Sequence, residues 1–239
     1  MTDARLGSVD EFCWMDLKTR DMPGTAAFFS EVLGWSFAVD GEDWRRATKI
    51  SVGGHRIGSV SDLANPVYPP GTPPHIAYYL AVDEVDGHIE AAASKGARLV
   101  VPPFDAGDQG RMAMLLDPLG AAFSLWQPYA FGGWNLPPDL PGAPRRMALA
   151  CEQPDRARHF YREVLGASLA CADFVPSLHP VASAPQWELA VGAEDPDAVA
   201  ARARVYGPEA VSRTEEPGGP VVRVTSPEGL RFQVRALNP

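Results

Sequence analysis

The sequence predicts an α+β protein built from four tandem βαβββ modules, which form two similar domains. Two internal repeats support this prediction. A capped amphipathic segment leads through an aromatic pair into Glu-Val-Leu-Gly twice, first after Phe28-Phe29 and again after Phe160-Tyr161. An Asp-Pro-Leu-Gly turn at 117–120 is matched by Ser-Pro-Glu-Gly at 226–229. Because self-similarity on this scale marks a repeat architecture, we predict a tandem duplication.

The composition is that of an ordinary globular protein. The chain has 239 residues, which is long enough for two domains, and 46% of them are hydrophobic and 21% are charged. A net charge of −9 argues against a nucleic-acid partner, because phosphates attract basic surfaces. No apolar run is long enough to span a membrane and the N-terminus has no apolar signal core. We therefore expect no membrane partner and a cytoplasmic location.

The cysteines do not indicate a disulfide framework or a zinc site. The chain has three of them, Cys13, Cys151 and Cys171, and none is spaced as CxxC. Cys13 and Cys151 fall in predicted strands, where free thiols pack as small hydrophobic groups. We do not expect a nucleophilic role for Cys13, because a reactive thiol needs exposure and a low pKa.

The first module is predicted from alternation and from helix caps. Residues 12–18 alternate between apolar and polar positions and predict a strand. Asp21 is the expected N-cap of a helix that has Pro23 in its first turn and ends at Gly34. Three strands should follow, over 36–40, 44–52 and 55–61, with Gly53-Gly54 as the turn between the last two.

The second module repeats this order after a proline-rich connector at 64–74. A strand is predicted over 75–82, and it is followed by a helix that Asp83 should cap and Gly96 should close. Three strands complete the module, over 98–101, 111–116 and 121–126. The first domain is therefore expected at residues 9–128.

A Pro- and Gly-rich segment, 129–144, is predicted to be a linker to a second domain at 145–237. A helix is expected over 154–165, but 166–186 leaves room for little more than one strand, so the third module should be shortened. The fourth module is predicted to have a helix starting at Asp195-Pro196, with strands over 187–191, 210–213, 221–225 and 230–236.

The aromatic pairs before Val-Leu-Gly, Ala81-Val82-Asp83 at the second helix and Asp-Pro-Leu-Gly before Phe123 carry a family resemblance. In these motifs the chain resembles the glyoxalase/bleomycin-resistance/dioxygenase superfamily, also called vicinal oxygen chelate proteins. It looks most like a two-domain branch whose members are often labelled hydroxylases. The resemblance covers nearly the whole chain outside the linkers. It implies curved mixed sheets with helices outside and a concave pocket inside.

Enzymes of this superfamily hold a divalent metal with His, Gln or Glu side chains from the first and last strands of the modules. Carried onto this chain, the ligand positions fall on Trp14, Ala77 and Ser124 in the first domain and on Arg146, Glu188 and Gln233 in the second. Neither set suits a divalent ion, so no metal cofactor is expected. The alternative is a divalent metal held by His75, two residues from Ala77 on the same strand face, with His55 or Asp16 as a helper.

Strand alternation predicts which side chains line each concave face. Large aromatic groups with a few polar ones suit a pocket for a small organic ligand. In the first domain the expected ligand-binding residues are Trp14, Asp16, His75, Tyr79, Ser124 and Trp126. The alternative is that Trp14 and Trp126 only fill a cavity. In the second domain Glu188 should join a structural ion-pair network with the neighbouring arginines, on a face with Arg146, Arg231, Gln233 and Arg235.

The sequence therefore leaves three hypotheses. The first is a metal-independent small-molecule-binding protein with its pocket in the first domain. The second is a metal-dependent enzyme, a glyoxalase-like lyase, dioxygenase or hydroxylase, and the third is an inert scaffold or interaction protein. No catalytic residue is assigned, since GxSxG, P-loop and GxGxxG motifs are missing. A monomer or homodimer is expected, and His88, His159 and His179 should be surface or structural residues.

Overall fold

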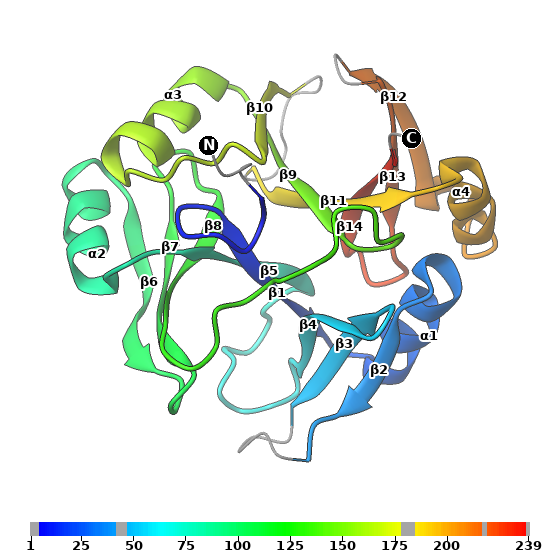
Figure 1. Cartoon of the computed structure of the whole chain (residues 1–239), viewed down its shortest axis with the longest axis horizontal. Helices are drawn as coiled ribbons and strands as arrows, with labels where there is room; N and C mark the ends of the chain where they lie inside the picture. The colour runs from blue at the N-terminus through cyan, green and yellow to red at the C-terminus, as the bar shows by residue number, and fades with distance from the viewer. Residues whose placement is uncertain (1–4, 42–46, 178–184, 217–218, 238–239) are drawn as a thin grey trace. The chain divides into compact units, whose positions relative to one another are not determined.

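The computed structural model of the chain describes residues 5–41, 47–177, 185–216 and 219–237 (Figure 1). Its first half contains two modules that each run from a strand through a helix into three further strands. The first module is β1 (Phe12–Thr19), α1 (Met22–Leu33), β2 (Ser36–Val39), β3 (Thr48–Val52) and β4 (His55–Asp62). The second is β5 (His75–Ala81), α2 (Val85–Ser94), β6 (Arg98–Asp105), β7 (Gly110–Leu116) and β8 (Ala122–Pro128).

The second half repeats this order with a shortened third module. That module is β9 (Pro144–Cys151), α3 (Pro154–His159), a π-helical turn η1 (Phe160–Val164) and β10 (Ala172–Pro176). The fourth is β11 (Trp187–Ala193), α4 (Pro196–Arg204), a 3₁₀ turn η2 (Pro208–Ala210), β12 (Val211–Glu216), β13 (Gly219–Thr225) and β14 (Arg231–Ala236). Within the described residues, β10 is the one strand between η1 and β11. The α+β class and the tandem modules are confirmed, and His179 lies outside the described residues.

The strands form two mixed sheets. Among the described residues the strand order is β2-β3-β4-β1-β5-β8-β7-β6 in one sheet and β10-β9-β11-β14-β13-β12 in the other. Four neighbouring pairs are parallel: β1 with β4, β5 with β8, β9 with β10, and β11 with β14. The hairpins β2–β3–β4, β6–β7–β8 and β12–β13–β14 are antiparallel. Each sheet thus contains modules that follow one another in the sequence.

The compact units of the chain combine the modules differently. Unit 1 consists of Met1–Trp14, Ala77–Asn135 and Arg146–Glu188, and so contains most of the second and third modules. Unit 2 consists of Met15–Ile76, Leu136–Arg145 and Leu189–Pro239, which are most of the first and fourth modules. Strands β1, β5, β9 and β11 therefore contribute residues to both units. The predicted domain limits, 9–128 and 145–237, stay a prediction.

Helix caps are largely as the sequence predicts. The Asp21 carboxylate accepts a hydrogen bond from the Gly24 amide at 3.0 Å, and Gly34 ends α1 with a φ of 71°, a left-handed conformation that glycine adopts without strain. The predicted cap of α2, Asp83, is wrong. The helix begins one residue later, and the Glu84 carboxylate accepts from the amides of Asp86 and Gly87 at 2.8 and 2.6 Å.

The repeated motifs build the two cores. In unit 2, Phe29 stacks on Trp35 with ring centroids 4.9 Å apart and also packs against Phe232. In unit 1, Tyr161 packs against Phe123 at 5.2 Å. All four of these phenylalanine and tyrosine rings are almost fully buried. The two Pro-Gly turns close alike, since the amides of Asp117 and Ser226 each donate to a carbonyl four residues on at 2.8 Å.

No helix in the described part of the chain is both long and apolar enough to span a membrane.

Candidate functional site

Strand β1 carries a core face and a polar face. On the core face Cys13, Met15 and Leu17 are fully buried, as period-two alternation predicts. The opposite face carries Trp14, Asp16 and Lys18, and the parallel register with β4 places Asp16 opposite Ser59 and Lys18 opposite Ser61. Asp16 keeps only 7% of its side-chain surface exposed and Lys18 only 12%. Two charged side chains are thus buried on one strand, which is rare unless they are paired.

In unit 2 these two side chains organise a polar cluster. The Asp16 cluster, as we call it, comprises Asp16, Lys18, Ser61, Tyr68 and His75. The Lys18 ammonium donates to Asp16 Oδ2, to the Ser61 hydroxyl at 3.2 Å and to the Tyr68 hydroxyl at 2.9 Å. It also lies 4.9 Å from the centre of the Tyr68 ring, within the range of a cation–π contact. The Ser61 hydroxyl in turn donates to Asp16 Oδ2 at 2.7 Å.

One oxygen of this cluster has no partner. Asp16 Oδ1 is buried and receives no hydrogen bond from any residue that the structure describes, while Oδ2 receives two. Leaving a buried polar atom unsatisfied costs about 1–3 kcal/mol, and more for a charged group. Most buried polar groups in native structures form hydrogen bonds, so the unsatisfied Asp16 Oδ1 requires an explanation.

His75 lies at the start of β5 and is half-buried. Its Nδ1 is 2.8 Å from the Pro73 carbonyl oxygen. Because a carbonyl can only accept, Nδ1 carries the proton and Nε2 of the neutral ring has a free lone pair. Burial lowers the pKa of His75 from 6.5, and the Lys18 ammonium lowers it further, although the Pro73 bond and the Asp16 carboxylate act against this shift. The ring is therefore neutral at pH 7.

In unit 1 the predicted site residues form an aromatic cluster: Trp14, Tyr79, Trp126 and, in addition, Phe131. The Phe131 ring meets Trp14 edge-on at 4.7 Å and Trp126 at 6.1 Å, and Trp126 meets Tyr79 at 6.2 Å. The Trp126 indole N–H donates to the Phe131 carbonyl at 2.9 Å. Ser124 is buried on β8, opposite Tyr79 in the parallel register. Phe131 comes from the predicted linker and was not among the predicted residues.

The three first-domain positions that the family resemblance marks as metal ligands do not suit a divalent ion. Trp14 and Ala77 have no lone pair to donate, and a neutral serine hydroxyl such as that of Ser124 is a weak ligand. The alternative set fares no better, because the Lys18 ammonium bound to Asp16 would repel a cation. Across the described ranges, no three His, Cys, Asp or Glu side chains gather as a metal site would require.

Several arginines of the second half take part in ion pairs. In unit 1, Arg146 binds the Asp173 carboxylate through two nitrogens, at 3.1 and 2.7 Å. In unit 2, Arg223 and Arg235 each donate to Glu216 at 2.7 Å. Asp173 and Glu216 are carboxylates that the sequence analysis did not single out. Paired in this way, the guanidinium groups hold neighbouring strands together.

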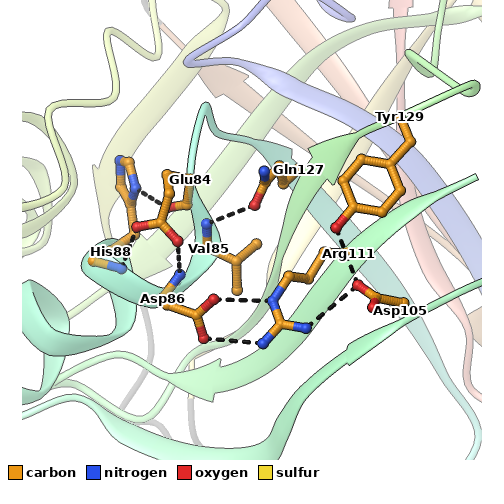
Figure 2. Close-up of polar contacts among 9 residues, drawn as sticks. Glu84, Val85, Asp86, His88, Asp105, Arg111, Gln127 and Tyr129 are labelled. Carbon is orange, nitrogen blue, oxygen red and sulfur yellow. Dashed lines mark hydrogen bonds and ion pairs between the residues drawn. The ribbon is translucent and has the colours of Figure 1, made fainter.

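A second polar network surrounds the start of α2 in unit 1 (Figure 2). Arg111 of β7 binds the Asp86 carboxylate at 3.0 and 3.1 Å and Asp105 at 3.3 Å, and the Tyr129 hydroxyl donates to Asp105 at 3.1 Å. Arg111 lowers the pKa of Asp86, while burial and Asp105 raise the pKa of Tyr129. These groups are on the surface and satisfy one another, so we interpret the network as a brace between α2, β6 and β7.

Two other buried acids are also satisfied. Glu11 accepts from the Ser168 hydroxyl at 2.9 Å and from the amides of Ala170 and Cys171 at 2.5 and 3.2 Å. Asp117 accepts from the Tyr161 hydroxyl at 3.2 Å. Burial raises the pKa of both carboxyl groups, although their hydrogen bonds oppose the shift. These contacts anchor neighbouring segments.

The cysteine thiols, His88 and His159 occupy structural or surface positions in the part of the chain that the structure describes. All three cysteines are buried and none forms a disulfide, and burial raises the pKa of the Cys13 and Cys151 thiols. Raised pKa values keep these thiols protonated and unreactive. His88 donates within α2 to the Glu84 carbonyl at 2.5 Å, and His159 is exposed at the end of α3, which confirms their expected structural or surface positions.

Comparison with known proteins identifies relatives over the length of the chain. The sequence profile of the Glyoxalase/Bleomycin resistance protein/Dioxygenase superfamily matches residues 12–125. CFP32 of Mycobacterium tuberculosis, named as a candidate glyoxylase, is 27% identical over 246 residues, which are 92% of this chain and 92% of CFP32. The anthracycline biosynthesis protein DnrV of Streptomyces peucetius is 25% identical over 254 residues, 94% of this chain and 92% of DnrV.

Solved structures share the fold at lower identity. A Mn(II)-bound glyoxalase from Novosphingobium aromaticivorans aligns with a TM-score of 0.63 and 15% identity, covering 95% of this chain and 82% of that one. The 2,2',3-trihydroxybiphenyl 1,2-dioxygenase of Sphingomonas wittichii strain RW1 aligns with a TM-score of 0.63 and 12% identity, covering 96% and 91%. At these identities the likeness concerns the fold alone.

Proposed function

Because this chain belongs to the glyoxalase/bleomycin resistance/dioxygenase superfamily, we propose that it binds a small organic molecule without a metal ion. The observation that carries the proposal is the chemistry at the superfamily's metal positions. Trp14 and Ala77 offer no metal ligand and Ser124 only a weak one. Trp14 and Trp126 are instead buried aromatic groups of unit 1, and Ser124 lies opposite Tyr79 in the strand register. Aromatic rings with few polar groups are what a binding site for a small apolar molecule needs.

The aromatic cluster supplies the proposed contacts in unit 1: Trp14, Tyr79, Ser124 and Trp126. Edge-to-face pairs of such rings contribute about 0.5–1.5 kcal/mol beyond the area they bury, and an aromatic ligand that replaced Phe131 could make the same contacts. Asp16 and His75 belong to unit 2 and are proposed as ligand contacts on separate evidence below. The monomeric or homodimeric state and the cytoplasmic location stay predictions.

A metal-dependent lyase, dioxygenase or hydroxylase is the second candidate, because the solved neighbours include a Mn(II)-bound glyoxalase and a dioxygenase. Those likenesses support the fold, whereas the donor set of this chain speaks against the metal. An inert scaffold is the third candidate, since Phe131 packed between Trp14 and Trp126 would equally fill an unused cavity. Measurements of ligand binding and of metal content distinguish these three candidate functions.

Ligand-detected NMR titration with phenol and anisole tests the proposal. We expect wild-type protein to bind at least one of these arenes, and Trp14→Ala to weaken that binding about tenfold, which corresponds to about 1.4 kcal/mol of lost ring contact. Trp187→Phe is the matched control, because Trp187 is buried in the separate aromatic core around Tyr161. Binding unaffected by Trp14→Ala, or no binding of either arene, would refute the proposed site.

A further inference from the structure

We propose that the Asp16 cluster of unit 2 binds an uncharged ligand group that donates a hydrogen bond, a hydroxyl or an N–H. The inference rests on the proposed binding function and specifies the ligand chemistry that one part of the protein selects. Its starting point is Asp16 Oδ1, which is buried and lacks a donor among the residues that the structure describes. A donor on a ligand would remove the cost of leaving this oxygen unsatisfied.

The charges of the cluster exclude ionic ligands. The Lys18 ammonium balances the Asp16 carboxylate, and Lys18 directs donors to Asp16, Ser61 and Tyr68. A cationic ligand that approached Asp16 Oδ1 would be repelled by the nearby Lys18 ammonium. An anionic ligand would meet the Asp16 carboxylate, and the Lys18 ammonium that would attract it already donates to three groups. Because both ion types meet a like charge at short range in a poorly solvated place, a neutral group is favoured.

His75 adds a second acceptor to the cluster. Its Nδ1 proton is used by the Pro73 carbonyl, so Nε2 of the neutral ring can only accept. Asp16 Oδ1 and His75 Nε2 can therefore only accept hydrogen bonds. Both atoms favour a ligand group that donates one. Methyl ethers, ketones and other groups that only accept would leave these lone pairs unsatisfied.

The duplicated strand shows that the fold does not need these side chains. At the constant offset of the repeat, Ala148 and Ala150 of β9 replace Asp16 and Lys18, and Val175 of β10 occupies the register position of Ser61. Ala148 is as buried as the strand's core residues. Replacing both charged residues by alanine should therefore preserve the strand while removing the proposed acceptor.

Phenol and anisole test the inference, because they differ in whether the ring oxygen can donate a hydrogen bond. We expect wild-type protein to bind phenol about tenfold more tightly than anisole, about the effect of one good hydrogen bond to a charged group. The double variant Asp16→Ala with Lys18→Ala should lose this preference and unfold at an unchanged or higher urea midpoint. Asp173→Asn is the matched control and should keep the preference for phenol. It changes a carboxylate of β10 that lies opposite Ala148, as Ser59 of β4 lies opposite Asp16.

Asp16→Asn provides a second variant of nearly identical shape. Lys18 and Ser61 both donate, so they should hold the amide oxygen in the place of Oδ2 and turn the amide NH₂ to the place of Oδ1. An acceptor thereby becomes a donor, and the preference for phenol should be lost, because the oxygens of phenol and anisole can both accept from an N–H. If the double variant fails to fold, this variant decides the question.

Several outcomes would overturn the inference. Equal binding of phenol and anisole by the wild type, with both lost in Trp14→Ala, would leave the proposed function standing and refute the donor-selective site. A phenol preference that persists in the Asp16 variants would place the selectivity elsewhere. Failure of the wild type to bind either probe would refute both the function and the inference.

Discussion

Strands β1 and β9 open the two halves of the duplication and differ on one face. Their core faces carry a methionine and a leucine at matching positions, all fully buried: Met15, Leu17, Met147 and Leu149. The other face has Asp16 and Lys18 in β1 but Ala148 and Ala150 in β9. Both strands pair in parallel with a neighbour, β1 with β4 and β9 with β10. The core face is therefore what the fold preserves.

The difference separates residues needed for folding from residues retained for another reason. Replacing a buried ion pair by apolar residues is often neutral or stabilising, because the pair must be desolvated. Strand β9 is the natural example of such a replacement. Strand β1 keeps the pair and an unsatisfied Asp16 oxygen besides, which is a stability cost that ligand binding would explain.

Breaking the pair should have the largest effect on stability. Lys18→Met leaves the Asp16 carboxylate buried without its ammonium, and we expect a loss of about 3–5 kcal/mol in the free energy of unfolding. Combining it with Asp16→Ala should restore most of that loss. Urea titration followed by far-UV circular dichroism measures both.

Arg146→Ala is the control from β9. The Arg146–Asp173 pair is partly exposed, at 39% and 29% of the two side chains, so its loss should cost at most about 1 kcal/mol. Equal losses in Lys18→Met and Arg146→Ala would contradict the contrast between the two strands.

The pH dependence of stability should show a smaller effect of His75. Its pKa is lowered in the folded protein, so the unfolded chain binds more protons as the pH falls from about 6.5. Protonation of His75 should therefore lower the stability of the wild type as the pH decreases. Glu11 and Asp117 have raised pKa values and act in the opposite direction, because protonation favours the folded state for them.

The measurement is therefore a difference between two proteins. The unfolding free energy of the wild type minus that of His75→Gln should decrease below about pH 6.5, since the glutamine variant lacks only this titration. A difference that does not change between pH 7 and pH 5 would show that His75 is not held neutral by the fold.

The regular elements of this fold could be predicted because short-range physics decides them. Alternation in β1 follows from strand geometry, and Asp21 and Gly34 meet the local requirements of helix ends. Lys18 could have been found in the same way, since it lies two residues after Asp16 on the same face. The cap of α2 was assigned to Asp83 because two adjacent acids offer the same cap, and only the backbone shows that Glu84 is used.

The partners of the site residues could not be predicted, because they come from segments without periodicity. Phe131 and Tyr68 lie in proline-rich connectors, whose paths depend on tertiary packing. Asp173 and Glu216 become partners of arginines only through strand register. The sequence alone thus predicted which residues share a strand face with Asp16 but not the groups that neutralise their charges.

Elemental analysis tests the central claim most directly. Protein purified without a tag or chelator should contain less than about a tenth of an equivalent of Mn, Fe, Co, Ni, Cu or Zn per chain, because a true divalent site retains its ion through purification. That result would support binding without a metal. A near-stoichiometric metal content would contradict the account and make His75 of β5 the leading ligand, with Asp16 of β1 as a helper.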